Sequence, residues 1–104
     1  MDRAATLKQF LETNPNDSFA RYGLALEHVR AGDAEAAISE FQKLIEINPD
    51  YTAAFQMAAQ TLIKIGRNQD AEGWLERGIA CATRTGNSHA KAEMQAMLDE
   101  LASS

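Results

Sequence analysis

The chain has few of the features that secreted proteins and membrane proteins need. Its single cysteine, Cys81, excludes an internal disulfide. No stretch approaches the ~20 consecutive apolar residues of a membrane span, and the N-terminus lacks the apolar core of a signal peptide. Only two prolines and six glycines occur, most of them where turns are expected. We therefore expect a cytoplasmic protein that does not engage a membrane.

Positive charge and catalytic motifs are also scarce. Ten Lys and Arg residues stand against fifteen Asp and Glu residues, which gives a net charge of −5. Because nucleic-acid affinity comes mainly from Lys and Arg neutralising phosphates, this balance argues against nucleic acid as a partner. His28 and His89 have no second histidine four residues away, and the glycines are single rather than grouped in a phosphate-binding loop. We predict no enzymatic activity, no metal and no cofactor.

What the sequence does contain is a pattern that recurs every 34 residues. A glycine, an alanine, a large apolar residue and an Asn-Pro pair each have a counterpart at that one offset. The matching positions are Gly32 and Gly66, Ala37 and Ala71, Phe41 and Leu75, and Asn14-Pro15 and Asn48-Pro49. A single shared offset indicates one structural unit used more than once.

The stretch between Gly32 and Pro49 predicts one complete helix. Asp33 occupies the position of an N-cap, and Phe41 and Leu44 follow at spacings that place them along one stripe. Pro49 lacks an amide hydrogen and would disrupt a helix interior, so the helix has to end before it.

These residues resemble the tetratricopeptide-repeat family, whose repeat has this length and folds as a helix-turn-helix. Counted from Ser18, the first repeat supplies Leu24, Ala25, Gly32, Ala37, Phe41, Leu44 and Pro49. Counted from Thr52, the second repeat supplies Phe55, Ala58, Ala59, Leu62, Gly66, Ala71, Leu75 and Gly78. The resemblance implies an all-α fold, a short solenoid of about six antiparallel helices.

The implied organisation is a single domain over residues 1–104. Its parts are an N-terminal half repeat at 1–14, repeat one at 18–51, repeat two at 52–85 and a C-terminal capping helix at 86–102. Terminal units are expected because an unstacked repeat leaves its apolar face in water.

The chain departs from the family pattern at several positions. Arg21 stands where the family prefers a large aromatic residue, and His28 stands where it prefers tyrosine. Thr83 replaces the proline that would end the second repeat, so the helix that begins near Asn68 is expected to continue toward Thr85.

The expected function is binding of a protein or peptide segment through a concave groove lined by the first helix of each repeat. Phe19, Tyr22 and Leu26 support this interpretation, because they exceed what one buried helix face needs. The residues predicted to contact the partner are Phe19, Tyr22, Leu26, Arg30, Gln56, Met57, Gln60, Lys64, Lys91 and Met94. Residues on the outer helices, such as Glu40, are expected to be dispensable.

The family's best-known groove holds the carboxylate end of a peptide with lysine, asparagine and arginine. Tyr22 and Leu26 stand where lysine and asparagine would be, and Met57 replaces the second asparagine. Only Lys91 keeps the required charge, so we do not expect a carboxylate clamp of that type. A segment with one or two bulky apolar anchors, flanked by acidic or amide groups, suits the remaining residues better.

Two alternatives remain open at the level of sequence. Phe19, Tyr22, Leu26 and Met94 are equally suited to the interface of a symmetric homodimer, which would make the protein a self-associating structural unit. The second alternative is a small-molecule or acyl-chain site in the same groove, which requires a closed pocket.

Overall fold

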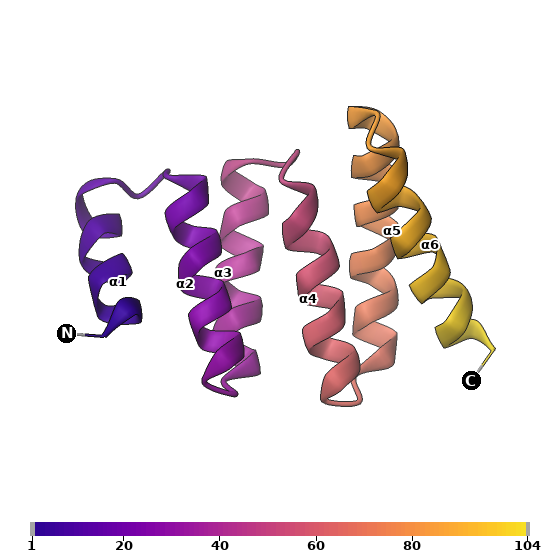
Figure 1. The fold of residues 1–104 in the computed structure, drawn as a ribbon, viewed down its shortest axis with the longest axis horizontal. Helices are drawn as coiled ribbons and strands as arrows, with labels where there is room; N and C mark the ends of the chain where they lie inside the picture. Colours follow the sequence, from indigo (N-terminus) through magenta and orange to yellow (C-terminus); the bar gives the residue numbers. More distant parts are fainter. Residues whose placement is uncertain (1, 104) are drawn as a thin grey trace. The chain divides into compact units, whose positions relative to one another are not determined.

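The computed structural model describes residues 2–103, which fold into α-helices and contain no β-strand. The helices follow one another in the order α1 (Arg3–Thr13), α2 (Ser18–Arg30), α3 (Ala34–Ile47), α4 (Thr52–Lys64), α5 (Asn68–Thr85) and α6 (Ser88–Ala102) (Figure 1). The all-α prediction and the number of helices are confirmed for this part of the chain.

Four of the helices begin at a side chain that satisfies a free backbone amide. In each case a carboxylate or amide oxygen accepts a hydrogen bond from the N–H three residues further on, which is the usual chemistry of an N-cap. These caps are Asp2, Asp17, Asp33 and Asn87. The distances lie between 2.7 Å at Asp2 and 3.1 Å at Asp33 and Asn87.

Glycines in the left-handed conformation follow α2, α4 and α5. Gly32, Gly66 and Gly86 have φ angles of 78°, 80° and 73°, which a side chain would disfavour. Gly86 sets the end of α5, since no proline stops the helix earlier. As predicted from the absence of that proline, α5 runs to Thr85 and spans 18 residues.

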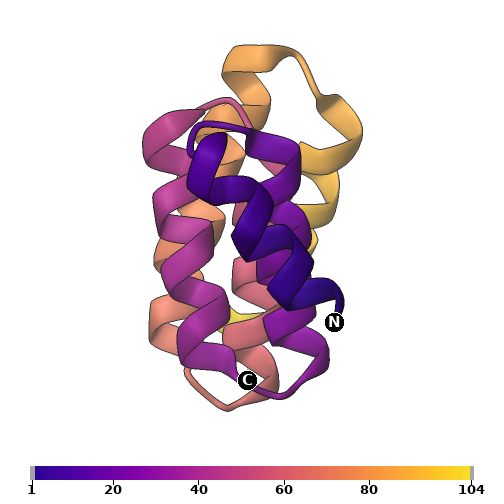
Figure 2. The same cartoon turned by 90° about the vertical axis from the view of Figure 1, so that its left-hand side faces the viewer.

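The chain divides into two compact units, which we describe separately. The N-terminal unit ends at Asn48 and contains α1, α2 and α3. Its α2 and α3 lie side by side as an antiparallel pair (Figure 1), and Ala25 of α2 and Ala37 of α3 are both fully buried. On the other side of α2, Leu11 and Leu24 belong to a second small core to which α1 contributes (Figure 2).

The C-terminal unit begins at Pro49 and contains α4, α5 and α6. Leu62 and Leu75, from α4 and α5, are almost completely buried. Trp74 is also buried, as a packing residue, and the Arg77 guanidinium lies 4.5 Å from its ring centroid. Cys81 is buried on the apolar side of α5, as expected.

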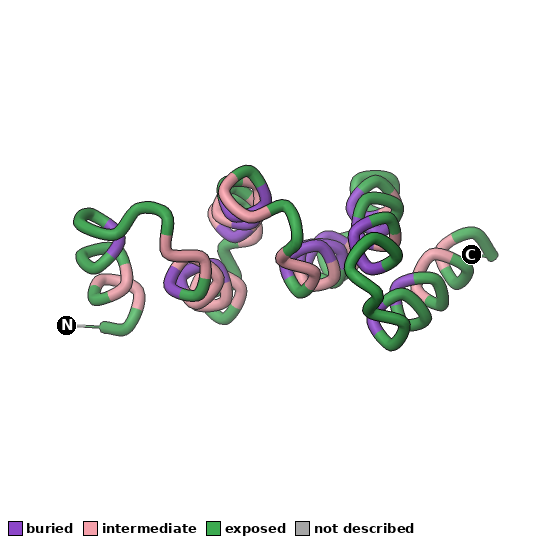
Figure 3. Tube along the Cα trace, turned by 90° about the horizontal axis from the view of Figure 1, so that it is seen from above, coloured by how far each residue is buried: buried purple, intermediate pink, exposed green. Residues whose placement is uncertain are grey.

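The first and last helices carry the fewest buried residues. Figure 3 shows mostly exposed or intermediate residues along α1 and α6, in contrast to the buried stripes of the helices between them. A helix at the end of a row of packed helices has neighbours on one side only, so fewer of its residues are buried. No helix within residues 2–103 combines the length and apolar character that a membrane span requires.

Candidate partner-binding surfaces

The exposed apolar residues of the N-terminal unit include a phenylalanine on the first helix of repeat one. Phe19 of α2 is 77% exposed. Tyr22 and Leu26 follow on the same helix at spacings of three and four residues, and both are half-buried. Because side chains at these spacings share one helix face, the three residues form a continuous apolar stripe.

Tyr22 has a second role that the sequence did not indicate. Its ring centroid lies 6.1 Å from that of Phe41, with the planes tilted by 55°. Such a tilted arrangement is favourable for aromatic rings and ties α2 to α3. The interpretation of Tyr22 as surplus to packing is therefore wrong, although part of its side chain remains accessible.

Arg30 ends the same helix and is exposed, but its charge is compensated. Its Nη1 lies 2.6 Å from the Glu27 carboxylate, which also binds Arg3 Nε at 3.0 Å. A shared carboxylate weakens the field that Arg30 presents to a partner.

In the C-terminal unit, α4 presents a polar stripe. Gln56, Gln60 and Lys64 lie four residues apart on one helix face; Gln56 is half-buried, and the other two are exposed. Gln56 Nε2 lies 3.5 Å from a carboxylate oxygen of Glu93 on α6. Met57, beside this stripe, is half-buried.

The two predicted contact residues of α6 have opposite surroundings. Lys91 is exposed. Met94 is 0% exposed, and its sulfur and methyl group lie against Gly78, where an added Cβ would come within 2.5 Å of the sulfur. The prediction that Met94 contacts a partner is therefore wrong, because the missing side chain of Gly78 makes room for it in the core. The homodimer hypothesis loses this residue too.

An ion pair between α2 and α3 was missed at the level of sequence. Arg21 Nη1 lies 2.6 Å from Glu40 Oε1, and the two side chains are only 13% and 14% exposed. Arg21 Nη2 also donates to the backbone carbonyl of Pro15 at 3.0 Å. Glu40 thus contacts the first helix of repeat one, a packing role that the sequence did not indicate.

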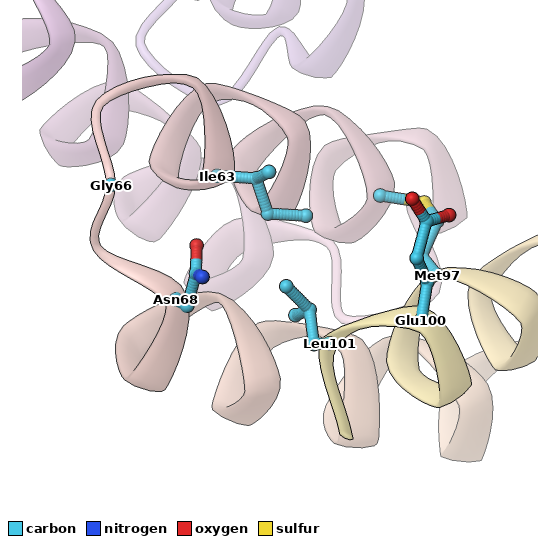
Figure 4. Close-up of a pocket in the computed structure, with 6 residues that line it drawn as sticks. All are labelled: Ile63, Gly66, Asn68, Met97, Glu100 and Leu101. Atoms are coloured by element: carbon cyan, nitrogen blue, oxygen red, sulfur yellow. The ribbon is translucent and has the colours of Figure 1, made fainter. Parts of the chain in front are cut away.

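A hollow of about 320 Å³ lies within the C-terminal unit (Figure 4). It is bordered by the end of α4, the α4–α5 turn and the second half of α6. Its lining consists of Ile63, Gly66, Asn68, Met97, Glu100 and Leu101. None of these residues was predicted to contact a partner. In the sequence, Ile63 directly precedes Lys64, which was a predicted contact residue.

The part of the chain that the structure describes offers no arrangement of side chains for binding a metal ion. Residues 2–103 contain no group of three or more His, Cys, Asp or Glu side chains placed to hold an ion. Cys81 is held inside the C-terminal unit, where its sulfur contacts the Thr52 hydroxyl at 3.4 Å and the Pro49 carbonyl at 3.5 Å.

Comparison with known proteins finds the same repeat. Two family models, both described as tetratricopeptide repeat, match residues 28–99 and residues 2–52. A TPR repeat-containing protein of Pseudomonas aeruginosa is 30% identical over 95 residues, which cover 91% of this chain and 90% of that protein.

Comparison with solved structures finds similar folds. The solution structure of a tetratricopeptide repeat domain protein from Salinibacter ruber is 30% identical and has a TM-score of 0.77, covering 84% of this chain and 88% of that chain. The crystal structure of PcrH in complex with the chaperone binding region of PopD has a TM-score of 0.88 at 17% identity. That match covers 96% of this chain and 76% of that chain. At that identity the similarity to PcrH concerns the fold alone.

Proposed function

This chain belongs to the tetratricopeptide-repeat family, and we propose that it binds a protein or peptide segment through side chains on α2, α4 and α6. The fold of this family is a protein-interaction module. The fold of PcrH, which resembles that of this chain, holds a region of another protein. The proposal assigns the contacts to the first helix of each repeat and to the last helix of the chain.

The exposure of Phe19 carries the proposal. Burying a phenylalanine side chain contributes about 1.5–3 kcal/mol, so a ring that is 77% exposed holds a large unused share of that free energy. Tyr22 and Leu26 extend the apolar surface along α2. A bulky apolar side chain of the partner would gain most by packing here, since aromatic anchors dominate the free energy of many interfaces.

The polar residues of the C-terminal unit supply selectivity. Gln60, Lys64 and Lys91 are exposed, and neither lysine forms an ion pair with any residue in the described range 2–103. Uncompensated cations favour acidic partner groups and accelerate the encounter with them. The partner we propose therefore combines an apolar anchor with acidic or amide side chains.

Site-specific photo-crosslinking tests this assignment. A benzoylphenylalanine at position 19 places the reactive group on the α2 stripe, and the same group at Ser39, exposed on α3, is the matched control. We expect ultraviolet light to join a second protein to the chain from position 19 and not from position 39. Equal products from both positions, or none from position 19, would contradict the proposal.

The same experiment separates the homodimer alternative. A product of twice the mass of the chain, together with a dimeric mass in light scattering, would identify Phe19 as part of a self-association interface. A product of any other mass, formed by a chain that scatters as a monomer, would identify a different protein as the partner.

A further inference from the structure

We propose that one side of α1 binds a helix of the partner, which places an apolar residue on Phe10 and an acidic residue on Arg3. Thr6 lies between these two residues, at spacings of three and four, so the three side chains share one side of α1, which we call the open face. This inference rests on the proposed function. It adds a second contact surface and specifies that the partner segment on it is helical.

The side of α3 that corresponds to the open face is covered by a helix. The repeat pattern recurs every 34 residues, so Thr6 corresponds to Glu40. Glu40 pairs with Arg21 of α2 at 2.6 Å, which shows that this side of α3 faces α2. α2 precedes α3 in the chain and lies antiparallel to it (Figure 1). In repeat one, the first helix therefore occupies this side of the second.

The corresponding positions differ sharply in exposure. Ala37 is the counterpart of Arg3 at the same offset, and it is 0% exposed. Leu44, the counterpart of Phe10, is also 0% exposed. On α1, by contrast, the Arg3 side chain is 66% exposed and Phe10 is 45% exposed. Figure 2 shows α1 at the outer side of the N-terminal unit, in front of α2 and α3. A helix placed beside α1 as α2 is placed beside α3 would bury the open face.

The open face adjoins the apolar stripe of α2. A Cβ added at Gly23 would lie 3.4 Å from a Leu7 methyl group, so these two positions are in contact. Phe10 follows Leu7 by three residues on α1, and Phe19 precedes the glycine by four on α2. Because α1 and α2 run antiparallel, both phenylalanines lie toward the same end of the pair, about one turn from that contact (Figure 1). A helix docked on the open face would therefore cover apolar surface of both rings, as helices do in hydrophobic grooves.

The charges beside Arg3 favour an acidic residue on the partner helix. Arg3 and Arg30 share the carboxylate of Glu27, at distances of 3.0 Å and 2.6 Å. The neighbouring carboxylate, that of Asp2, accepts a backbone N–H as the N-cap of α1, where the partial positive charge of the helix end also favours it. Two guanidinium groups thus have one carboxylate between them. A second carboxylate would complete the pairing when the docked helix removes Arg3 from water.

Three synthetic helices test the open face on the ¹⁵N-labelled full chain. Each has about 18 residues, because shorter isolated helices are only marginally stable in water. The first carries two leucines one turn apart and a glutamate two turns after the first leucine, which matches the separation of Phe10 and Arg3. The second has lysine in place of the glutamate, and the third has alanines in place of the leucines. We expect the first to shift the amide resonances of Thr6 and Phe10 in a saturable way, the second to bind more weakly, and the third not to bind.

Variants of α1 provide the sharper measurement. Phe10→Ala should weaken binding of the Leu/Glu helix about 3- to 10-fold, as expected when about half of a phenylalanine side chain is no longer buried. Arg3→Gln should weaken it roughly 2- to 5-fold and abolish the preference for glutamate over lysine. Lys8→Gln is the matched control, since it also removes one positive charge from α1 and should change neither value. Lys8 lines a hollow on the other side of the helix, together with Leu11 and Arg21. Thermal melting of the variants will show that the fold is retained.

Several results would overturn the assignment of the open face. Absent or equal binding of the three helices, shifts centred outside α1 and the first turns of α2, or a Phe10→Ala variant that binds like the wild type would each contradict it. A dimeric mass in light scattering that Phe10→Ala converts to a monomeric one would show that a second copy of the chain covers this face instead. These outcomes leave the proposed function intact, provided that position 19 still crosslinks to a partner. If position 19 fails to crosslink while the Leu/Glu helix binds as described, the proposed function fails and the open face remains a helix-binding surface.

Discussion

Arg21 and Glu40 join the two helices of repeat one by an ion pair with 2.6 Å between Nη1 and Oε1. Both side chains are largely shielded from water, so the attraction is screened less than at an exposed site. The guanidinium also donates to the Pro15 carbonyl, at the turn that precedes α2. A charged residue at the position of the family's aromatic residue thus links the helix pair to the preceding turn.

The first prediction follows from that pair. Glu40→Ala removes the carboxylate partner of a shielded guanidinium, which keeps only the Pro15 carbonyl, and should lower the free energy of unfolding by about 1–3 kcal/mol. Gln42→Ala, on the same helix, removes only an exposed hydrogen bond to Glu46 and should cost less than about 0.5 kcal/mol. Urea denaturation measures both. If Glu40→Ala has the midpoint of the wild type, the ion pair contributes nothing to stability.

The double variant Arg21→Met with Glu40→Leu separates the cost of an orphaned charge from the value of the pair. Replacing a shielded ion pair by apolar residues of similar volume is often neutral or stabilising. We therefore expect the double variant to be at least as stable as Glu40→Ala and close to the wild type.

The second prediction concerns the packing of α6 on α5. A Cβ added at Gly78 would lie 2.5 Å from the Met94 sulfur and 2.7 Å from the Phe55 Cβ. The methionine tip has freedom to move, but the Phe55 Cβ is fixed to the backbone. Gly78→Ala should therefore overpack the contact and destabilise the protein by about 1–3 kcal/mol.

Gly73 provides the control for that change. It lies on the same helix, and a Cβ built there meets nothing within 4 Å. Gly73→Ala should stabilise the protein by about 0.5–1 kcal/mol, because alanine loses less conformational freedom on folding. Thermal melting gives both signs, and destabilisation by both variants would argue against a specific contact at Gly78.

The misplacement of Met94 shows where sequence periodicity stops being informative. A strict spacing of 34 residues aligns Met94 with the exposed Gln60. Because no proline stops α5, this helix runs on to Thr85, and α6 begins at Ser88. Met94 is then aligned with Ala58, 36 residues earlier and fully buried. Sequence predicted the longer helix, but not the shift that it imposes on the next one.

Caps and turns were predictable because they depend on chemistry within a few residues. Asp33 and Gly32 act through bonds and dihedral angles in their own segment. The Arg21–Glu40 pair and the hollow beside Ile63 depend on distances between helices, which no local pattern encodes. The fold was therefore predictable in outline, whereas the residues around each candidate site required the structure.

The third prediction separates binding from stability on α2. Phe19→Ala removes a side chain that is 77% exposed and should leave the free energy of unfolding within about 0.5 kcal/mol of the wild type. Leu24→Ala, in the core of the same helix, should cost about 2–5 kcal/mol. Tyr22→Ala should lie between them, since the contact of its ring with Phe41 contributes about 0.5–1.5 kcal/mol.

The effects of the α2 substitutions on partner binding should follow a different order from their effects on stability. Phe19→Ala and Leu26→Ala should weaken the interaction, measured by titration with the crosslinked partner once it is identified, although Phe19→Ala melts like the wild type. If Phe19→Ala binds with unchanged affinity, the apolar stripe of α2 is not the contact surface.

The last prediction concerns the polar stripe of α4. Lys64 is exposed and without an ion pair among residues 2–103, so it should act on the encounter rather than on the final contacts. Lys64→Glu should lower the association rate constant and reduce its dependence on salt, with little change in the dissociation rate constant. Lys8→Glu on α1 makes the same change of charge at an exposed position outside the proposed surface. Stopped-flow measurements at low and high salt distinguish the two. If both variants slow association equally, net charge rather than the α4 stripe guides the partner.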